Sequence, residues 1–175
     1  MVIACCDSRS GPETIFNCKP GELFVIRNIA SQVPPFQPDG AYHGTSAALE
    51  YAVQALQIEH IVVLGHAHCG GIKQALSSHY EPLSSSDFIG GWLHLLDEQA
   101  EQLLTNKKLT PAERQTALEH LSIVQSLHHL RSFPWIKKKE QAQELSLHGV
   151  WFCIEKGQLW ELDEEEQKFQ LITAK

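Results

Sequence analysis

The chain has 175 residues, of which 43% are hydrophobic and 20% are charged, and this composition is typical of a single globular domain. The net charge of -7 argues against non-specific binding to nucleic acid, because phosphate contacts need a clustered positive surface and the only basic run is residues 137–139. No apolar stretch approaches the roughly 18 residues of a membrane span, and residues 1–5 are too short for a signal-peptide core. We therefore expect one domain over residues 1–175 that is soluble and cytoplasmic and binds neither nucleic acid nor membrane.

Strands and helices alternate in the first half of the chain. Three short apolar runs predict strands at residues 2–5, 23–26 and 61–64. A proline-rich loop precedes a helix predicted from about residue 45 to about residue 56, and a second, short helix is predicted after Gly71.

The second half predicts further helices and a final pair of strands. A serine cluster at residues 84–86 precedes an amphipathic segment that reaches about residue 104. Thr110, Pro111 and Glu113 form a strong helix start, with a capping residue, a proline at the first helical position and a glutamate that completes a capping box. That helix is predicted to run to about residue 130, and Pro134 opens another. Strands are predicted at residues 148–154 and 158–162, joined by a turn at residues 156–157.

Two short motifs supply a set of metal ligands. Cys5-x-Asp7-x-Arg9 lies near the start of the chain, and His66-x-x-Cys69 lies much further along. Two thiolates and one imidazole suit zinc and leave its fourth tetrahedral position free for water or for a movable carboxylate. Structural zinc sites usually fill all four positions with Cys or His, so this set predicts a catalytic metal site.

Strand geometry favours Cys5 over Cys6 as the ligand. In an extended chain alternate residues project to one side, so we expect Cys5, Asp7 and Arg9 to share a face while Cys6 points away. The motif that begins at His66 follows a buried strand, and ligands of open α/β sheets bind at the carboxyl ends of strands. Both halves of the ligand set are therefore expected at the same edge of the sheet.

Four ordered motifs resemble the beta-class carbonic anhydrases, and the resemblance covers nearly the whole chain. The motifs are Cys5-Cys6-Asp7-Ser8-Arg9 and the segments at residues 20–30, 48–53 and 65–71. The resemblance implies an α/β fold with a central, mostly parallel sheet flanked by helices. It also implies reversible hydration of carbon dioxide to bicarbonate and a proton, with one Zn2+ per chain in a homodimer or tetramer.

The resemblance and the chemistry of the residues together suggest a mechanism. Zinc held by Cys5, His66 and Cys69 makes hydroxide available near neutral pH, and two thiolate ligands predict an activity that rises on the alkaline side of neutrality. Asp7 is expected to accept a hydrogen bond from the zinc-bound hydroxide, while Arg9 keeps Asp7 ionised and in position. In some family members the matching aspartate takes the fourth zinc position at low pH, so Asp7 is also a predicted metal ligand in that closed state only.

A small, apolar substrate needs a pocket with hydrophobic walls. Phe24, Ile29 and Tyr51 match the pocket-lining positions of the family, and the Gly70 N–H is expected to hold a bicarbonate oxygen. In the family this pocket lies at a dimer interface, so both subunits are expected to supply its walls. For His68 two interpretations stay open, a proton relay and an ordinary exposed histidine.

The chain departs from the family pattern in two places. The family usually carries a helical amino-terminal arm that wraps the partner subunit, and because Met1 lies only four residues before Cys5 we expect that arm to be missing or shortened. Val2 stands where members with a non-catalytic bicarbonate site carry tryptophan. We therefore expect an open zinc at neutral pH, as in the plant-type group.

Two other functions remain open at this point. The same scaffold would hydrolyse carbon disulfide or carbonyl sulfide if its entrance were narrowed, and activity on those substrates without carbon dioxide hydration would identify that function. Without the arm, the chain would instead be a zinc-binding protein with little or no turnover. A stable, zinc-containing dimer favours the enzyme over this second alternative.

Overall fold

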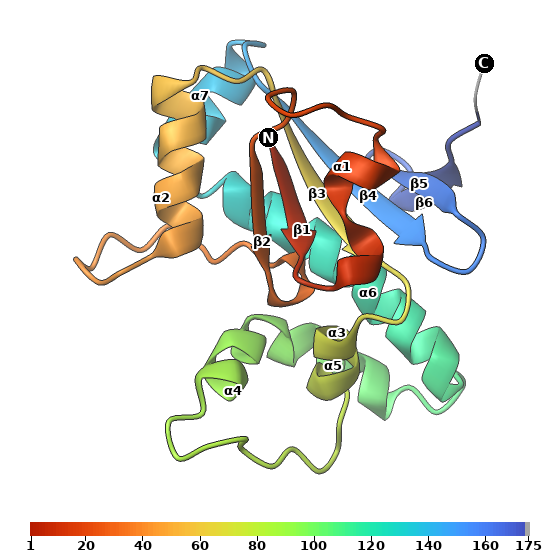
Figure 1. Ribbon diagram of the computed structural model, residues 1–175. Helices are drawn as coiled ribbons and strands as arrows, with labels where there is room; N and C mark the ends of the chain where they lie inside the picture. Colours follow the sequence, from red (N-terminus) through yellow and green to blue (C-terminus); the bar gives the residue numbers. More distant parts are fainter. Residues whose placement is uncertain (174–175) are drawn as a thin grey trace.

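The computed structural model describes residues 1–173, and its centre is a six-stranded sheet in the order β2-β1-β3-β4-β5-β6 (Figure 1). The strands are β1 (Val2–Cys5), β2 (Val25–Asn28), β3 (His60–His66), β4 (Ser146–Cys153), β5 (Gln158–Asp163) and β6 (Lys168–Leu171). Strands β2, β1, β3 and β4 pair in parallel, whereas β5 and β6 add antiparallel pairs at one edge. The predicted α/β fold with a mostly parallel sheet is confirmed.

Seven α-helices surround the sheet in the described part of the chain: α1 (Pro12–Ile15), α2 (Gly44–Glu50), α3 (Gly70–Ala75), α4 (Phe88–Leu93), α5 (Asp97–Thr105), α6 (Pro111–Leu130) and α7 (Pro134–Gln141). The predicted capping box at α6 is present, since the Thr110 hydroxyl accepts from the Glu113 N–H at 3.2 Å and the Glu113 carboxylate accepts from the Thr110 N–H at 2.8 Å. Helix α2 continues as a wider π-helical turn at Tyr51–Ala55, so the helix predicted there is also confirmed.

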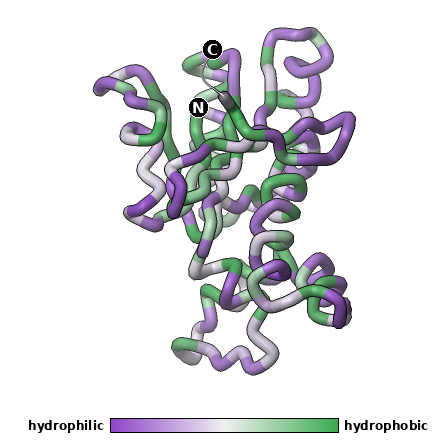
Figure 2. Tube along the Cα trace, turned by 90° about the vertical axis from the view of Figure 1, so that its right-hand side faces the viewer, coloured by the Kyte–Doolittle hydropathy of each residue, from purple (hydrophilic) through white to green (hydrophobic). Residues whose placement is uncertain are grey.

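The sheet buries a different set of side chains on each face, as strand alternation requires. Ile3 of β1 packs in a cluster with Leu49 of α2 and Ile123 of α6, whereas its neighbours Val2 and Ala4 belong to a second cluster on the opposite face. In Figure 1 α6 crosses behind the sheet and α1 lies in front of it. Figure 2 shows hydrophobic segments concentrated in the central strands and hydrophilic segments in the outer loops.

Helix α6 approaches the sheet closely at two glycines. A Cβ atom at Gly65 of β3 would lie 2.7 Å from Ile123 Cδ1, and one at Gly149 of β4 would lie 2.8 Å from Ile123 Cγ2. Real Cβ contacts are longer than this, so either substitution would force Ile123 to move. The two glycines therefore let α6 lie directly against β3, which carries His66, and against the neighbouring strand β4.

Several predicted boundaries are wrong. Strand β2 lies two residues later than predicted, because Arg27 and Asn28 pair with β1 in register although their side chains are polar. Strand β3 extends as far as His66. The amphipathic segment is divided into α4, a 3-10 turn at His94–Leu96 and α5. The short helix α1 and the polar edge strand β6 were not predicted.

No helix within residues 1–173 combines the length and the apolar character needed to cross a bilayer. In Figure 1, helices α3, α4 and α5 gather beyond the carboxyl ends of the parallel strands. A third apolar cluster joins this group to the sheet and includes Cys5, Cys69 and Leu96. The predicted metal site thus lies where the sheet meets these three helices.

Candidate metal centre

The three predicted metal ligands meet at the carboxyl edge of the sheet. Cys5 ends β1, His66 ends the adjacent parallel strand β3, and Cys69 immediately precedes α3. All three are buried, and one potential ligand atom from each lies within 4.8 Å of the others. Within residues 1–173 this is the only such group of three histidine, cysteine or acidic residues.

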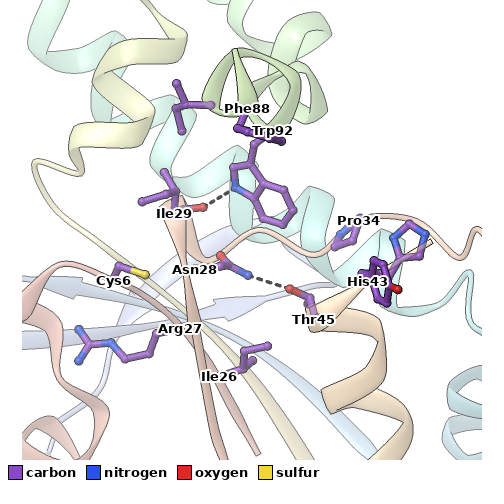
Figure 3. A pocket seen from close by; sticks show the side chains of 13 residues that line it. Cys6, Ile26, Arg27, Asn28, Ile29, Pro34, His43, Thr45, Phe88 and Trp92 are labelled. Carbon is purple, nitrogen blue, oxygen red and sulfur yellow. Dashed lines mark hydrogen bonds between the residues drawn. The ribbon is translucent and has the colours of Figure 1, made fainter. Parts of the chain in front are cut away.

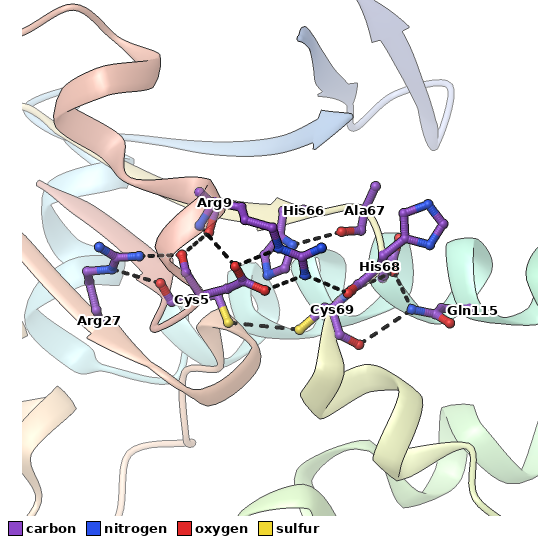
Figure 4. Close-up of polar contacts among 11 residues, drawn as sticks. Cys5, Arg9, Arg27, His66, Ala67, His68, Cys69 and Gln115 are labelled. Atoms are coloured by element: carbon purple, nitrogen blue, oxygen red, sulfur yellow. Dashed lines mark hydrogen bonds and ion pairs between the residues drawn. The ribbon is translucent and has the colours of Figure 1, made fainter. Parts of the chain in front are cut away.

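The donor set fits a zinc ion. The two sulfur atoms of Cys5 and Cys69 lie 3.9 Å apart, and two thiolates bound about 2.3 Å from one tetrahedral zinc would lie about 3.8 Å apart. The Nδ1 atom of His66 lies 2.9 Å from the Ala67 carbonyl oxygen, to which it donates (Figure 4). This bond leaves His66 Nε2 as the other ring nitrogen, and that atom is buried and has no hydrogen-bond partner among residues 1–173. A metal ion would satisfy it.

Contact between the two thiols favours the ionisation of one of them. The hydrogen bond with Cys69 lowers the pKa of Cys5, and the same contact raises the pKa of Cys69, because the pair shares a proton. Both cysteines bind a metal as thiolates, so metal binding at this site releases protons.

Asp7 and Arg9 form a tight ion pair beside the cluster. Arg9 Nε donates to Asp7 Oδ1 at 2.9 Å and Arg9 Nη2 donates to Asp7 Oδ2 at 2.6 Å (Figure 4). These hydrogen bonds hold the pKa of Asp7 well below its usual range. The pair forms as predicted, but not through an extended strand. Asp7 caps a 3-10 turn at Ser8–Ser10, and its carboxylate accepts from the Arg9 backbone N–H at 2.9 Å.

Arg27 fastens the segment that carries Cys5 and Asp7, a contact that the sequence analysis missed. From β2, its Nε donates to the Cys5 carbonyl at 2.8 Å and its Nη2 donates to the Asp7 carbonyl at 2.6 Å (Figure 4). The available signal was its place in the family-like segment at residues 20–30, where a basic residue interrupts an apolar strand. Arg27 therefore holds the backbone of a ligand and of the neighbouring carboxylate together.

Glu119 of α6 lies beside Cys69 and was also missed. Its carboxylate accepts from the Cys69 N–H at 3.2 Å and from Trp151 Nε1 at 3.1 Å. Burial raises the pKa of Glu119. In sequence Glu119 stands between Leu118 and His120, a charged residue that nothing local marks as buried, and only the close approach of α6 to the sheet places it inside.

An apolar cavity of about 630 Å³ lies next to the Cys5–Asp7 segment. Its lining includes Cys6, Asn28, Ile29, Thr45, Phe88 and Trp92 (Figure 3). The Trp92 indole donates to the Ile29 carbonyl at 2.9 Å, and the Asn28 amide donates to the Thr45 hydroxyl at 3.3 Å. Ile29, a predicted pocket residue, therefore lines this open cavity, whereas Cys5, His66 and Cys69 are not among its lining residues.

Phe24 and Tyr51 do not line this cavity within one chain. Their rings contact each other, with centroids 6.0 Å apart. Phe24 precedes β2, four residues before Asn28, which pairs with Cys5, so it lies roughly 13 Å along the strand from the metal end. Tyr51 is 56% exposed. Their role in a pocket stays a prediction that requires a second subunit.

Gly70 and His68 occupy the turn around Cys69. Gly70 is the first residue of α3, so its N–H has no partner within the helix, and the space beside its Cα is open. His68 adopts a left-handed conformation with φ 54°, and its exposed ring lies 2.9 Å from a Glu155 carboxylate oxygen. The bicarbonate contact of Gly70 stays a prediction, and the two interpretations of His68 stay open.

The fold and the site define a class, an open α/β protein with two cysteines and one histidine at the carboxyl edge of its parallel strands. The family model described as carbonic anhydrase matches residues 1–159. Beta carbonic anhydrase 3 of Arabidopsis thaliana is 34% identical over 168 residues, which cover 93% of this chain and 64% of the relative. The chain therefore belongs to the beta-carbonic anhydrase family, although it spans less than two thirds of that relative's length.

Solved structures of the family agree with this assignment. The beta-carbonic anhydrase CcaA superposes with a TM-score of 0.87 at 32% identity, covering 99% of this chain and 77% of that one. A structure from the report on two tetrameric beta-carbonic anhydrases of Sordaria macrospora superposes with a TM-score of 0.75 at 33% identity, covering 93% of this chain and 79% of that one.

Proposed function

We propose that this chain is a zinc-dependent carbonic anhydrase, which catalyses the reversible hydration of carbon dioxide to bicarbonate and a proton. Cys5, His66 and Cys69 would hold one Zn2+ per chain. The observation that carries the proposal is the convergence of these three buried donors within 4.8 Å, beside an ion-paired carboxylate. Zinc in such a site supplies Lewis acidity, which lets water ionise near neutral pH.

Asp7 has the capacity to orient the attacking oxygen. Its Oδ1 atom accepts from both the backbone and the side chain of Arg9, whereas Oδ2 accepts only from Arg9 Nη2 among the described residues. Because a carboxylate oxygen has two acceptor positions, Oδ2 keeps one for a proton on the incoming oxygen. Arg9 keeps Asp7 ionised and turned away from a metal-ligand role, which supports the open form of the site.

The substrate and the assembly belong to the same proposal. Carbon dioxide is apolar, and Ile29 offers an apolar wall near the Cys5–Asp7 segment. The free N–H of Gly70 suits a bicarbonate oxygen. Phe24 and Tyr51 would complete the pocket of a partner chain in a homodimer or tetramer, since they lie far from the site of their own chain. The cytoplasmic location stays a prediction.

The test is stopped-flow hydration of carbon dioxide by the zinc-loaded protein, from slightly acidic to clearly alkaline pH. We expect a rate well above that of the buffer, which rises with pH and is lost on Asp7→Ala with zinc still bound. A rate equal to that of the buffer at every pH, with one zinc per chain, would reject the proposal.

A further inference from the structure

A buried carboxylate lies behind one of the three candidate ligands. Glu119 is only 2% exposed, and it sits on α6, one turn after Gln115. One carboxylate oxygen accepts from the Cys69 N–H at 3.2 Å and from the Gln115 side-chain amide at 3.1 Å. The other accepts from Trp151 Nε1 at 3.1 Å. Glu119 thus links the turn that carries Cys69 to a neighbouring strand, β4.

Burying this carboxyl group costs free energy of folding. Its three hydrogen-bond donors are neutral N–H groups, and the described residues place no lysine or arginine in an ion pair with it. A carboxyl group buried without a cationic partner carries a desolvation cost, which an apolar side chain of similar size would avoid. Packing alone therefore does not account for a glutamate at this position.

The backbone of Cys69 is held on both sides by this group of residues. Glu119 accepts from the N–H of Cys69, while the Gln115 amide donates to its carbonyl at 3.4 Å (Figure 4). The residue before it, His68, has a φ of 54°, a left-handed conformation that is uncommon for a non-glycine residue. Two fixed points on one residue determine the direction of its Cα–Cβ bond.

We infer that Glu119 is a positioning residue of the metal centre, holding the Cys69 backbone so that Cys69 Sγ stays 3.9 Å from Cys5 Sγ. This inference rests on the proposed zinc site. Residues that hydrogen-bond to metal ligands fix the orientation of those ligands. Losing one such hydrogen bond typically weakens metal binding 10- to 100-fold.

The decisive variant is Glu119→Gln, which keeps the size of the side chain but replaces one acceptor oxygen with a donor. We expect its zinc affinity, measured by competition with a chromophoric chelator, to fall about 10- to 100-fold. In the cobalt-substituted protein we expect the thiolate-to-cobalt absorption bands to shift and weaken, because Cys69 changes its orientation. Gln115→Ala removes the partly exposed side chain that donates to the Cys69 carbonyl and to Glu119. It should change both readouts in the same direction by a smaller factor, and it replaces Glu119→Gln as the test if that variant does not fold.

Ser126→Ala is the matched control. Ser126 lies seven residues further along α6, is 1% exposed, and accepts a hydrogen bond from the Val33 N–H at 3.2 Å, away from the metal cluster. It should lower the free energy of unfolding while the zinc affinity and the cobalt spectrum stay as in the wild type. The inference is overturned if Glu119→Gln retains both wild-type readouts, or if Ser126→Ala loses as much affinity. A wild-type chain that binds no zinc would overturn the proposed function as well.

Discussion

Strand β3 carries a histidine at each end, and the two differ in burial and in their hydrogen-bond partners. His60, at the amino end, is exposed, and its Nδ1 lies 3.2 Å from His148 Nε2, while His148 Nδ1 lies 3.4 Å from a Glu161 oxygen. His66, at the carboxyl end, is 1% exposed and keeps a buried nitrogen without a partner. Residues typical of metal sites occur at both ends of β3. Among the described residues, only the carboxyl end combines burial, two thiols and a histidine nitrogen without a hydrogen-bond partner.

Removing one of the two thiolates is expected to have the largest effect on the site. We expect Cys69→Ser to lose both zinc and activity, with carbon dioxide hydration falling to the rate of the buffer, because serine does not replace a thiolate as a zinc ligand. The paired control, His60→Ala with His148→Ala, should keep one zinc per chain and the full rate. Metal analysis and stopped-flow hydration measure both. Zinc loss in the control would show that the amino end is the metal site.

The carboxylates at the two ends differ in their partners, since Asp7 is paired with Arg9, whereas Glu161 is paired only with His148 among the described residues. In Arg9→Ala the pKa of Asp7 should rise towards its usual range, because its main stabilising hydrogen bonds are gone. Asp7 is then protonated at higher pH, so the acidic limb of the pH–rate profile should move to higher pH. We also expect kcat to fall on the order of 100-fold. An unchanged profile would contradict the role of the pair.

Arg27 tests whether backbone support matters at the carboxyl end. Arg27→Ala removes the donors to the Cys5 and Asp7 carbonyls, and we expect about a 10-fold loss of kcat/KM with a smaller loss of zinc affinity. Lys73→Ala, at an exposed position on α3 that makes no side-chain hydrogen bond or ion pair within residues 1–173, is a suitable control. Equal rates for Arg27→Ala and the wild type would show that the hydrogen bonds from Arg27 to the Cys5 and Asp7 carbonyls do not contribute to activity.

His120 separates burial from metal binding, since it is partly buried yet belongs to no group of potential metal ligands within residues 1–173. Its ring stacks on Phe169 with centroids 4.1 Å apart and meets Trp151 edge-on. Burial lowers the pKa of His120 to about 4 from an ordinary value of 6.5. The neutral ring is therefore favoured in the folded chain, and the resulting stability is complete above pH 6.5 and is lost as the pH falls from 6.5 towards 4.

The expected pH effect is modest. Over that range the wild type should lose stability faster than His120→Phe, by a fraction of the roughly 1.4 kcal/mol per pH unit that one uncompensated proton costs. Chemical denaturation at several pH values measures the difference. Parallel curves for the two proteins would mean that His120 titrates as it does in the unfolded chain.

The parts of this molecule that could be predicted are those that local chemistry specifies. Thr110, Pro111 and Glu113 specify the start of α6 through a capping box, and a buried apolar strand followed by a histidine and a cysteine identifies one half of the metal site. Cys5 was distinguished from Cys6 by strand alternation alone. These features depend on neighbours in sequence, so a single chain is enough to predict them.

The parts that were missed depend on contacts between distant segments. Glu119 enters the site because Gly65 and Gly149 allow α6 to lie against the sheet, and nothing near Glu119 in sequence indicates this. Arg27 reaches Cys5 only because β2 pairs with β1. Asp7 and Arg9 meet through a 3-10 turn and not an extended strand. The predicted pocket role of Tyr51 would require a second chain, so the fold of one chain does not test it.

The most direct test of zinc-dependent catalysis at Cys5, His66 and Cys69 is a titration of the metal-free protein with zinc. The rate of carbon dioxide hydration is measured after each addition. We expect the rate to rise in proportion to added zinc, to level off at one equivalent per chain, and to stay at that of the buffer at every zinc concentration in Cys69→Ser. Binding of one zinc per chain without any increase in rate, or an equal increase in Cys69→Ser, would contradict this expectation.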